Sequence, residues 1–547
     1  MKFNLIDEQW IPVRRHDGTR DRIAPHEITK NFADNPVMAL DTPRPDFNGA
    51  LIQFLIGLVQ TAAAPADEDD WEDLLAQQPT PEALQQKFLI LRHAFELFGD
   101  GPRFMQPIEA LIDAENLPIE RLLIDAPKQN TLDLNKDHFV KRDAVSSMCL
   151  SCCATALFTA QTNSPAGGPG FRTSLRGGGP LTTLILGDSH FATLWHTIWL
   201  NILENKKFLT LCNSRLTTDS AKFPWLAPTK PQATEQDIHP AHYFWAMPRR
   251  IWLRQDSMVS GLCGICGREE NNLITQYCEL NKGTEYKPPM KHHLSPYDSS
   301  EKKRKALLTQ PGGIYYRYWL GIVFRENGAT KEPARIVHDY TENRQKPGWQ
   351  FRVWSFGYDM DKAKARCWYE AKFPLITVEK QYIPAYQEAV FSIIKSADMI
   401  CGNMKIAIKR VFHGNPEIDK MTRKIKWKYK DIKRLPSDEE KERDRVLKSV
   451  KEKSLFDVVE VRFWHETEEG YFRTLEGVKN ALVSNSEYSG LRCEWHHILC
   501  RAALEQFDAI IFDGPFEDME IKRVALARNE LESINNSRKV REALRID

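Results

Sequence analysis

The sequence predicts an α+β protein, in which a large mixed α/β N-terminal domain, residues 1–376, precedes an all-α C-terminal four-helix bundle, residues 377–547. Three observations lead to this prediction. The length of 547 residues is enough for two large domains. Stretches rich in aromatic and β-branched residues continue to about residue 376. From Gln381 onward, the apolar residues recur at helical spacing.

The N-terminal domain is predicted to mix strands with helices. Residues 4–13 are strand-like, and residues 47–63 carry apolar side chains at helical spacing, which predicts a buried helix. Thr80 and Pro81 predict the start of another helix, because threonine caps a helix and proline suits its first turn. Two later segments are typical of strands, residues 314–319 and 349–356.

The C-terminal domain is predicted from helical periodicity. Apolar residues recur every three or four positions from residue 381 to residue 400. Further helices are predicted at 438–455, 489–513 and 517–541. About four helices of this length can form a bundle around one core.

Composition and charge exclude several classes of protein. Lys and Arg number 75 against 74 Asp and Glu, so the net charge is +1 and any nucleic-acid site must be local. A hydrophobic content of 42% excludes collagen-like and disordered classes. The longest apolar stretch, residues 50–65, is too short to span a membrane, and the first residues lack the features of a signal peptide. We therefore expect a cytoplasmic protein.

Two close cysteine pairs are candidate metal ligands. Cys149 and Cys152 form one Cys-x-x-Cys pair, and Cys263 and Cys266 form a second one in which a glycine follows each cysteine. Four thiolates suit tetrahedral zinc, and the two-residue gap lets one turn present both sulfurs. The pairs therefore predict a structural zinc site. Cys153 is an alternative to Cys152, and free buried cysteines are the alternative to a metal.

Residues 164–180 are dense in glycine. They lack the Gly-Lys-Ser/Thr of a phosphate loop and the spaced glycines of a dinucleotide fold. Because glycine has no side chain in the way, this backbone suits close approach by a ligand. Typical phosphate donors follow, namely Arg172, Thr173, Ser174 and Arg176. The alternative is a pair of tight turns in a buried loop.

Two segments are strongly basic. Residues 421–434 are rich in cations, and basic and apolar side chains alternate from Lys424 to Lys430. An extended chain would place these cations on one face, which suits a phosphate backbone. The candidate cations are Arg423, Lys424, Lys426, Lys428 and Lys430. A second cluster, residues 302–305, begins with Lys302 and Lys303. For either segment taken alone, a solvated loop is the alternative.

Motifs for catalysis are scarce. The sequence has no Gly-x-Ser-x-Gly elbow, no His-Glu-x-x-His and no Walker motif. The best enzyme hypothesis is a metal-dependent nuclease that combines Cys263 and Cys266 with His292 and His293. Adjacent histidines are more often packing or surface residues, so the sequence favours a protein that is not an enzyme.

Several motifs occur together and in order. They are residues 4–13, the segment from Cys149 into the glycine-dense stretch, and residues 172–183, 248–251, 293–296 and 356–370. In these motifs the chain resembles the CasA family, the large subunits of type I-E CRISPR Cascade surveillance complexes. The predicted C-terminal helices agree with the four-helix bundle of that family.

The resemblance implies a non-catalytic protein that recognises the protospacer-adjacent motif in duplex DNA through the minor groove, starts strand separation and helps to recruit a helicase-nuclease. The implied partners are target double-stranded DNA, guide RNA, and the backbone, small and guide-end subunits of Cascade. No membrane partner is implied. A zinc-stabilised scaffold without DNA contact is the remaining alternative.

The resemblance also assigns the DNA contacts to a glycine loop, a lysine finger and a wedge. The glycine loop corresponds to Gly167, Gly168, Pro169 and Gly170, the finger to Lys302 or Lys303, and the wedge tip to Asp361 and Lys362. Some relatives have polar amides at the wedge tip, and the acidic Asp361 departs from that pattern. In this setting the run from Arg423 becomes a DNA-facing candidate.

Overall fold

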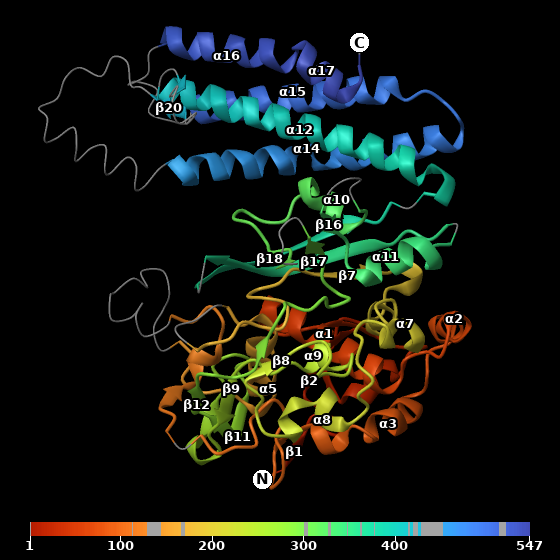
Figure 1. Ribbon diagram of the computed structural model, residues 1–547, viewed down its shortest axis with the longest axis vertical. Helices are drawn as coiled ribbons and strands as arrows, with labels where there is room; N and C mark the ends of the chain where they lie inside the picture. Colours follow the sequence, from red (N-terminus) through yellow and green to blue (C-terminus); the bar gives the residue numbers. More distant parts are fainter. Residues whose placement is uncertain are drawn as a thin grey trace, which may run out of the picture. The chain divides into compact units, whose positions relative to one another are not determined.

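The computed structural model describes residues 2–111, 113–127, 144–165, 170–299, 305–325, 330–346, 348–361, 364–376, 378–413, 416–418, 425–427, 452–512 and 521–546. The chain divides into two compact units. The first comprises Met1–Gln310 and Gly321–Leu375, and the second comprises Pro311–Leu320 and Ile376–Asp547. Helices and short strands mix in the first unit, and long helices dominate the second (Figure 1). The predicted α+β class with a C-terminal helical region is thus confirmed.

Two buried helices lie at the core of the first unit. α1 (Pro45–Ala62) has proline in its first turn and is buried along most of its length, which confirms the helix predicted at 47–63. α5 (Leu150–Asn163) is equally buried and packs against α1. The ring of Phe54 in α1 is the centre of an aromatic cluster. Its ring contacts are Trp10, Phe95, Phe104, Phe158 and Trp245.

Small sheets surround these helices. In the N-terminal sheet, β2 (Ile11–Arg15) lies between β3 (Arg20–Ile23) and β4 (Val37–Leu40). A hairpin joins β10 (Met258–Leu262) to β11 (Glu269–Ile274). A third sheet contains β6 (Asn116–Pro118), β12 (Gln276–Leu280) and β9 (Arg250–Leu253). The predicted cap of α3 (Pro81–Leu89) is also present, because Thr80 Oγ1 accepts a hydrogen bond from Ala83 N–H at 3.2 Å.

The longest strands form a hairpin in the first unit. β17 (Arg352–Asp361) pairs with β18 (Lys364–Pro374) on one side and with β7 (Thr182–Leu186) on the other. The strand predicted at 349–356 overlaps β17. The strand predicted at 314–319 is wrong, because η7 (Tyr316–Tyr318) and α10 (Trp319–Ile322) occupy this segment. Complete burial of Tyr316 outweighs the β propensity of the aromatic run here.

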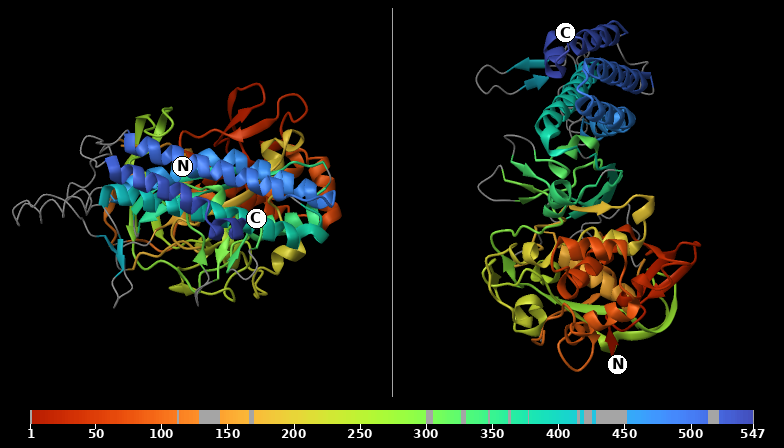
Figure 2. Two further views of the ribbon diagram at one scale, coloured as in Figure 1. Left: turned by 90° about the horizontal axis from the view of Figure 1, so that it is seen from above. Right: turned by 90° about the vertical axis from the view of Figure 1, so that its right-hand side faces the viewer.

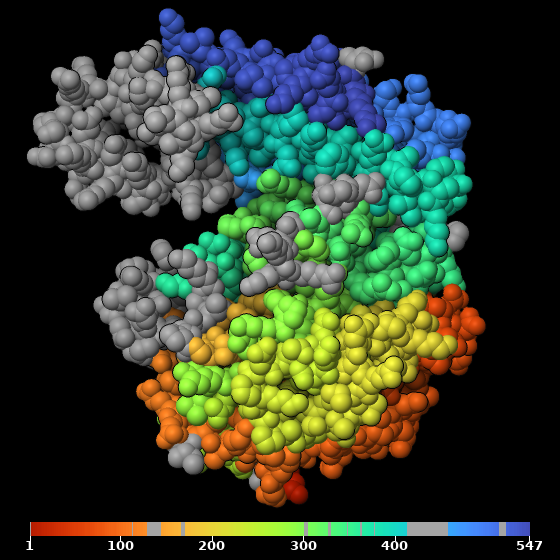
Figure 3. Space-filling model, in the orientation of Figure 1, coloured from red at the N-terminus to blue at the C-terminus, as the bar shows by residue number. Residues whose placement is uncertain are grey.

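Long helices build the second unit. Among the described residues, α12 (Ile383–His413) packs against four further helices, which are α14 (Glu452–Val483), α15 (Ser489–Phe512), α16 (Ile521–Asn535) and α17 (Arg538–Leu544). The long helices run side by side (Figure 2), and α12, α16 and α17 form one face of this unit (Figure 3). The helix predicted at 438–455 lies largely outside the described residues. No helix in the described part of the chain has the length and apolar content needed to cross a membrane.

Residues 311–320 join the second unit by burying an aromatic side chain in it. The ring of Tyr316 stacks on that of Tyr471, with centroids 4.2 Å apart. The hydroxyl group of Tyr316 lies 2.8 Å from Thr467 Oγ1. The chain therefore leaves the first unit after residue 310, contributes to the core of the second, and returns at residue 321. The predicted division at residue 376 did not include this excursion.

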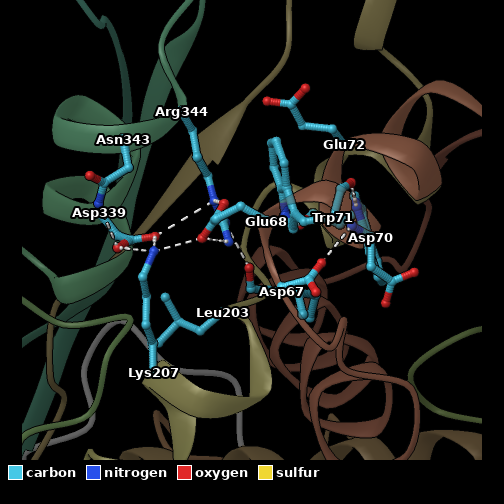
Figure 4. A network of polar contacts seen from close by, with 12 residues as sticks. Asp67, Glu68, Asp70, Trp71, Glu72, Leu203, Lys207, Asp339, Asn343 and Arg344 are labelled. Atoms are coloured by element: carbon cyan, nitrogen blue, oxygen red, sulfur yellow. Dashed lines mark hydrogen bonds and ion pairs between the residues drawn. The ribbon is translucent and has the colours of Figure 1, made fainter.

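Four charged side chains form a network within the first unit (Figure 4). They are Glu68 in α2 (Glu68–Ala76), Lys207 in α7 (Asn205–Leu209), Asp339 in α11 (Arg335–Asp339) and Arg344 in η8 (Tyr340–Arg344). Arg344 Nε lies 2.8 Å from Glu68 Oε2, and Lys207 Nζ lies 3.0 Å from Asp339 Oδ1. Two acids thus balance two cations where the side chains of Asp339 and Arg344 are each only 1% exposed.

Candidate functional site

Four cysteine sulfurs meet in the first unit. The Sγ atoms of Cys149, Cys152, Cys263 and Cys266 all lie within 4.8 Å of one another. Three of these residues are buried, and Cys266 is half-buried. Within the described ranges, no other group of three or more His, Cys, Asp or Glu side chains could hold a metal ion. The structure therefore brings the two predicted pairs together in an arrangement suited to a metal.

Local backbone geometry explains how each pair presents its sulfurs. Cys149 is the N-cap residue of α5, and Cys152 lies in the first turn of that helix. Cys263 and Cys266 lie in the turn between β10 and β11. Gly267 follows with φ of +70°, a conformation that favours glycine, and its N–H donates to the Cys263 carbonyl at 2.9 Å. A helix start and a tight turn thus face each other across the cluster.

Cys153 does not replace Cys152. Its thiol is fully buried and donates to the carbonyl oxygen of Met148 at 3.5 Å. Burial raises the pKa of Cys153 well above its usual value, so this thiol stays protonated. The four sulfurs named above are therefore the candidate ligand set.

The surroundings of the cluster favour a thiolate at Cys266. Hydrogen bonds with Cys149 and Cys152 lower the pKa of Cys266 to about 6. Arg22 in β3 adds a cation, since its Nη2 lies 3.7 Å from Cys266 Sγ while its Nη1 donates to Ser151 Oγ at 2.9 Å. Arg22 was not predicted from the sequence, because nothing in the residues around position 22 indicates proximity to position 266. Thiolates are the form of cysteine that binds metals.

The glycine segment follows α5. Gly167, Gly168 and Pro169 lie outside the described residues. Gly170 has φ of +83°, a conformation that favours glycine, and its carbonyl oxygen accepts a hydrogen bond from Lys282 N–H at 2.7 Å. Gly170, where the described chain resumes, is therefore held to Lys282 by a backbone hydrogen bond.

At Arg176 the structure supports the buried loop and not the phosphate donor, the two alternatives that the sequence leaves open. Arg176 is 4% exposed, and its guanidinium donates to Gln53 Oε1 at 2.6 Å and to Ser295 Oγ at 2.9 Å. Burial lowers the pKa of Arg176 to about 10. Its donors are thus bonded inside the protein and do not face a ligand. Arg172 forms an ion pair with Glu285 at 3.0 Å.

The lysine segment lies between two paired strands. Lys302 and Lys303 are outside the described residues. β14 (Tyr297–Asp298) pairs with β15 (Lys305–Ala306), with Asp298 opposite Lys305. The two ends of the segment that carries the candidate finger therefore lie side by side.

The β17–β18 hairpin carries Asp361 near its tip. Asp361 is opposite Lys364, and its side chain is 61% exposed. Lys362 lies outside the described part of the chain. The Arg366 guanidinium lies 4.0 Å from Asp361 and 2.6 Å from Asp359. A cation of the same hairpin thus offsets part of the acidic charge.

Residues 179–183 contact the described parts of all three loop regions. The N–H of Gly179 donates at 3.2 Å to the carbonyl of Asn163, which ends α5. The N–H of Leu181 donates at 2.8 Å to the carbonyl of Leu307, which follows the lysine segment. Phe356 of β17 pairs with Thr182 of β7. One short stretch of backbone therefore anchors the segments that lead to the glycine, lysine and hairpin loops.

The basic run of the second unit is described only in part. Lys426 belongs to β20 (Ile425–Trp427), where it is opposite Glu417 of β19 (Pro416–Ile418). The remaining candidates, Arg423, Lys424, Lys428 and Lys430, lie outside the described residues. The extended conformation considered for this run is thus present over three residues.

The adjacent histidines are packing residues. His292 and His293 are 2% and 1% exposed, and their rings stack with centroids 4.8 Å apart. Both rings also contact Phe244. Burial lowers the pKa of His293 to about 3 and that of His292 well below its usual value. Neither histidine belongs to the cysteine cluster, so the structure does not assemble the centre of the nuclease hypothesis.

Comparison with known proteins gives one consistent result. A family model described as CRISPR-associated protein Cse1 matches residues 4–506. The crystal structure of CasA from Thermus thermophilus is 17% identical, with a TM-score of 0.65 over 98% of this chain and 99% of that chain. Cse1 from Thermobifida fusca is 14% identical, with a TM-score of 0.67 over 100% of this chain and 98% of that chain.

A third similar structure is a chain of a CRISPR RNA-guided surveillance complex. It is 14% identical, with a TM-score of 0.63 over 98% of this chain and 100% of that chain. At such identities the structural likeness concerns the fold. The family model covers most of the sequence, and on that basis the chain belongs to the CRISPR-associated protein Cse1 family.

Proposed function

We propose that this chain is the large, non-catalytic subunit of an RNA-guided DNA surveillance complex. In this role it recognises the protospacer-adjacent motif in duplex DNA, starts strand separation and helps to recruit the helicase-nuclease, while guide RNA reads the rest of the target. Family membership and the likeness to a chain of a surveillance complex support this assignment. Its other partners are the backbone, small and guide-end subunits of the same complex. The complex acts in the cytoplasm.

The observation that carries the proposal is the shared anchor at residues 179–183. This backbone is hydrogen-bonded to the end of α5, to the chain after Lys302 and Lys303, and to β17. Gly179 also lies against the hairpin, since a Cβ atom added there would be 2.7 Å from Met360 Cγ. Three loops held by one stretch of chain suit a single binding surface.

The chemistry of the three loops fits the minor groove. That groove is narrow and its pattern of donors and acceptors is degenerate, so recognition depends on shape and on close approach. Residues 167–170 offer backbone with little side-chain bulk. Lys302 or Lys303 neutralises phosphates, and the hairpin tip at Asp361 and Lys362 acts as the wedge between strands.

In the second unit, we assign two roles to the helices and the basic run. The helices act as a four-helix bundle around α12, which packs against α14, α15 and α16. The run from Arg423 to Lys430 meets the DNA backbone, because its cations would release counterions from phosphates.

We assign a structural zinc ion to Cys149, Cys152, Cys263 and Cys266. Four sulfur ligands close the coordination sphere, so the ion serves folding and leaves no position for a substrate. The cluster lies at the N-terminal end of α5, and the other end of α5 reaches Asn163 beside the glycine segment. Zinc would therefore fix the helix from which the glycine loop begins.

The test is binding of guide-loaded complexes to target duplexes that carry the adjacent motif. The complexes contain this chain unmodified, with Gly168→Asp, or with Lys302→Ala and Lys303→Ala together. Each lost minor-groove or phosphate contact is worth about 1 kcal/mol or more, so we expect binding at least about 5-fold weaker with unchanged loading of guide RNA. Lys87→Ala, on the exposed face of α3, is the matched control.

Three outcomes would contradict the proposal. A folded Gly168→Asp variant that binds target normally would exclude the glycine loop as a contact. Neutralising the basic segments without changing the salt dependence of binding would favour a scaffold without DNA contact. Cleavage of naked DNA with added divalent metal, lost on substitution of His292 and His293, would show a nuclease.

A further inference from the structure

Arg22 has sulfur and hydroxyl partners where its neighbours have carboxylates. Within the described residues no carboxylate forms an ion pair with Arg22, and its guanidinium instead meets Ser151 Oγ at 2.9 Å and Cys266 Sγ at 3.7 Å. Arg20, two residues earlier in β3, lies 2.7 Å from a carboxylate oxygen of Asp41. In the part of the chain that the structure describes, the cysteine cluster is therefore the partner of Arg22 that can carry a negative charge.

The position of Arg22 links three segments that are distant in sequence. Ser151 lies between the two cysteines of the first pair, at the start of α5, and Cys266 belongs to the second pair. Arg22 itself belongs to the N-terminal sheet. One guanidinium group thus bridges both Cys-x-x-Cys pairs and ties them to a third element.

If the cluster holds the zinc ion proposed above, the guanidinium of Arg22 balances part of the charge of the site. Four thiolates around Zn²⁺ leave a net charge of −2 in a largely buried site, and an uncompensated charge there is costly. A cation beside Cys266 offsets part of it. The N–H of Cys149 adds a further donor, at 3.3 Å from Cys263 Sγ.

We propose that Arg22 is a positioning residue of the metal site. It holds the Cys266 sulfur in the position for coordination, and its hydrogen bond to Ser151 fixes the start of α5 relative to the β10–β11 turn. Outer partners of this kind orient ligands, and their loss commonly lowers metal affinity by about 10-fold to 100-fold. Lysine would keep the charge but lacks the fork that reaches two partners.

The test compares the full-length chain with Arg22→Met, Arg22→Lys and Arg20→Met. Zinc content is measured by elemental analysis, zinc affinity by competition with a chromophoric chelator, and sulfur bonding by the thiolate-to-metal charge-transfer band of the cobalt-substituted protein. We expect Arg22→Met to bind zinc about 10-fold to 100-fold more weakly, with a shifted band. Arg22→Lys should be intermediate, and Arg20→Met should match the unmodified chain.

The outcomes separate this inference from the zinc assignment. An unmodified chain that holds no zinc would refute the assignment, and the role of Arg22 with it. If the unmodified chain holds zinc tightly and both Arg22 variants have its zinc affinity and its charge-transfer band, the positioning role of Arg22 is refuted and the zinc assignment stands. If Arg22→Met does not fold, Arg22→Lys decides, because a wild-type affinity and band in that variant would also overturn the inference.

Discussion

Removal of the Tyr316 ring should destabilise the second unit, although Tyr316 belongs in sequence to the N-terminal part of the chain. Tyr316 is 0% exposed, and its ring stacks at 4.2 Å on Tyr471 of α14. The rings of Trp464 and Trp495 lie at 71° and 70° to the ring of Tyr316, with centroids 4.9 Å and 6.1 Å away. The ring therefore fills the core between α14 and α15.

The expected cost follows from these contacts. Truncation of a buried aromatic ring to alanine costs about 3–5 kcal/mol, including the cavity that remains. Tyr316→Phe is the matched control, because it keeps the ring and removes only the hydroxyl group that meets Thr467. Thr467 Oγ1 still donates to the carbonyl of Phe463 at 2.7 Å, so this control should cost only about 0.5–1.5 kcal/mol.

Hydrogen exchange of the full chain is the suitable assay, because it reports each unit separately. A cost of about 3–5 kcal/mol corresponds to amide exchange faster by roughly 100-fold to 5,000-fold in α14 and α15. Amides of α1 and α5 in the first unit serve as the internal reference. Exchange in α14 that is no faster in Tyr316→Ala than in Tyr316→Phe would refute the view that residues 311–320 stabilise the helical unit.

Three further predictions concern the first unit. Burial lowers the pKa of His242 from 6.5 to about 4, so the free energy of unfolding should not depend on this group above pH 6.5 and should fall by about 3 kcal/mol between pH 6.5 and pH 4. Urea unfolding measures this change, and His242→Gln should abolish this part of the pH dependence. Arg344→Met should lower the unfolding free energy by about 3–5 kcal/mol at neutral pH, because it leaves the buried Asp339 with less compensating charge; a thermal midpoint like that of the unmodified chain would contradict this. Gly179→Ala should cost about 1–2 kcal/mol from its φ of +62° and more from contact with Met360, whereas Gly177→Ala, also at positive φ but in open space, should show backbone strain alone in the same unfolding assay.

Local sequence signals predicted part of the fold well. The cap at Thr80 and the buried helix at 47–63 depend on neighbouring residues, and both are present. The aromatic run at 314–319 was misread because its conformation depends on burial of Tyr316 against a helix about 150 residues later in the chain. Intrinsic β propensity carries no information about that contact.

The candidate site divides in the same way. Cys-x-x-Cys spacing predicted each pair, because each lies within one short local structure, a helix start or a turn. That the two pairs meet was inferred only from the four ligands that tetrahedral zinc requires. Arg22 could not be predicted, since its role depends on the distance to position 266 in the folded chain. For Arg176 the sequence leaves a phosphate donor and a buried loop open, because the choice depends on its contacts with Gln53 and Ser295, which are distant in sequence.

The most direct test of motif recognition is a binding measurement on guide-loaded complex reconstituted with and without this chain. The duplexes carry one constant target and randomised flanking bases. We predict that selection among flanking sequences occurs only when the chain is present, and that it weakens in the Gly168→Asp variant. Binding that is equally indifferent to the flanks with and without the chain would contradict a role in recognising the adjacent motif.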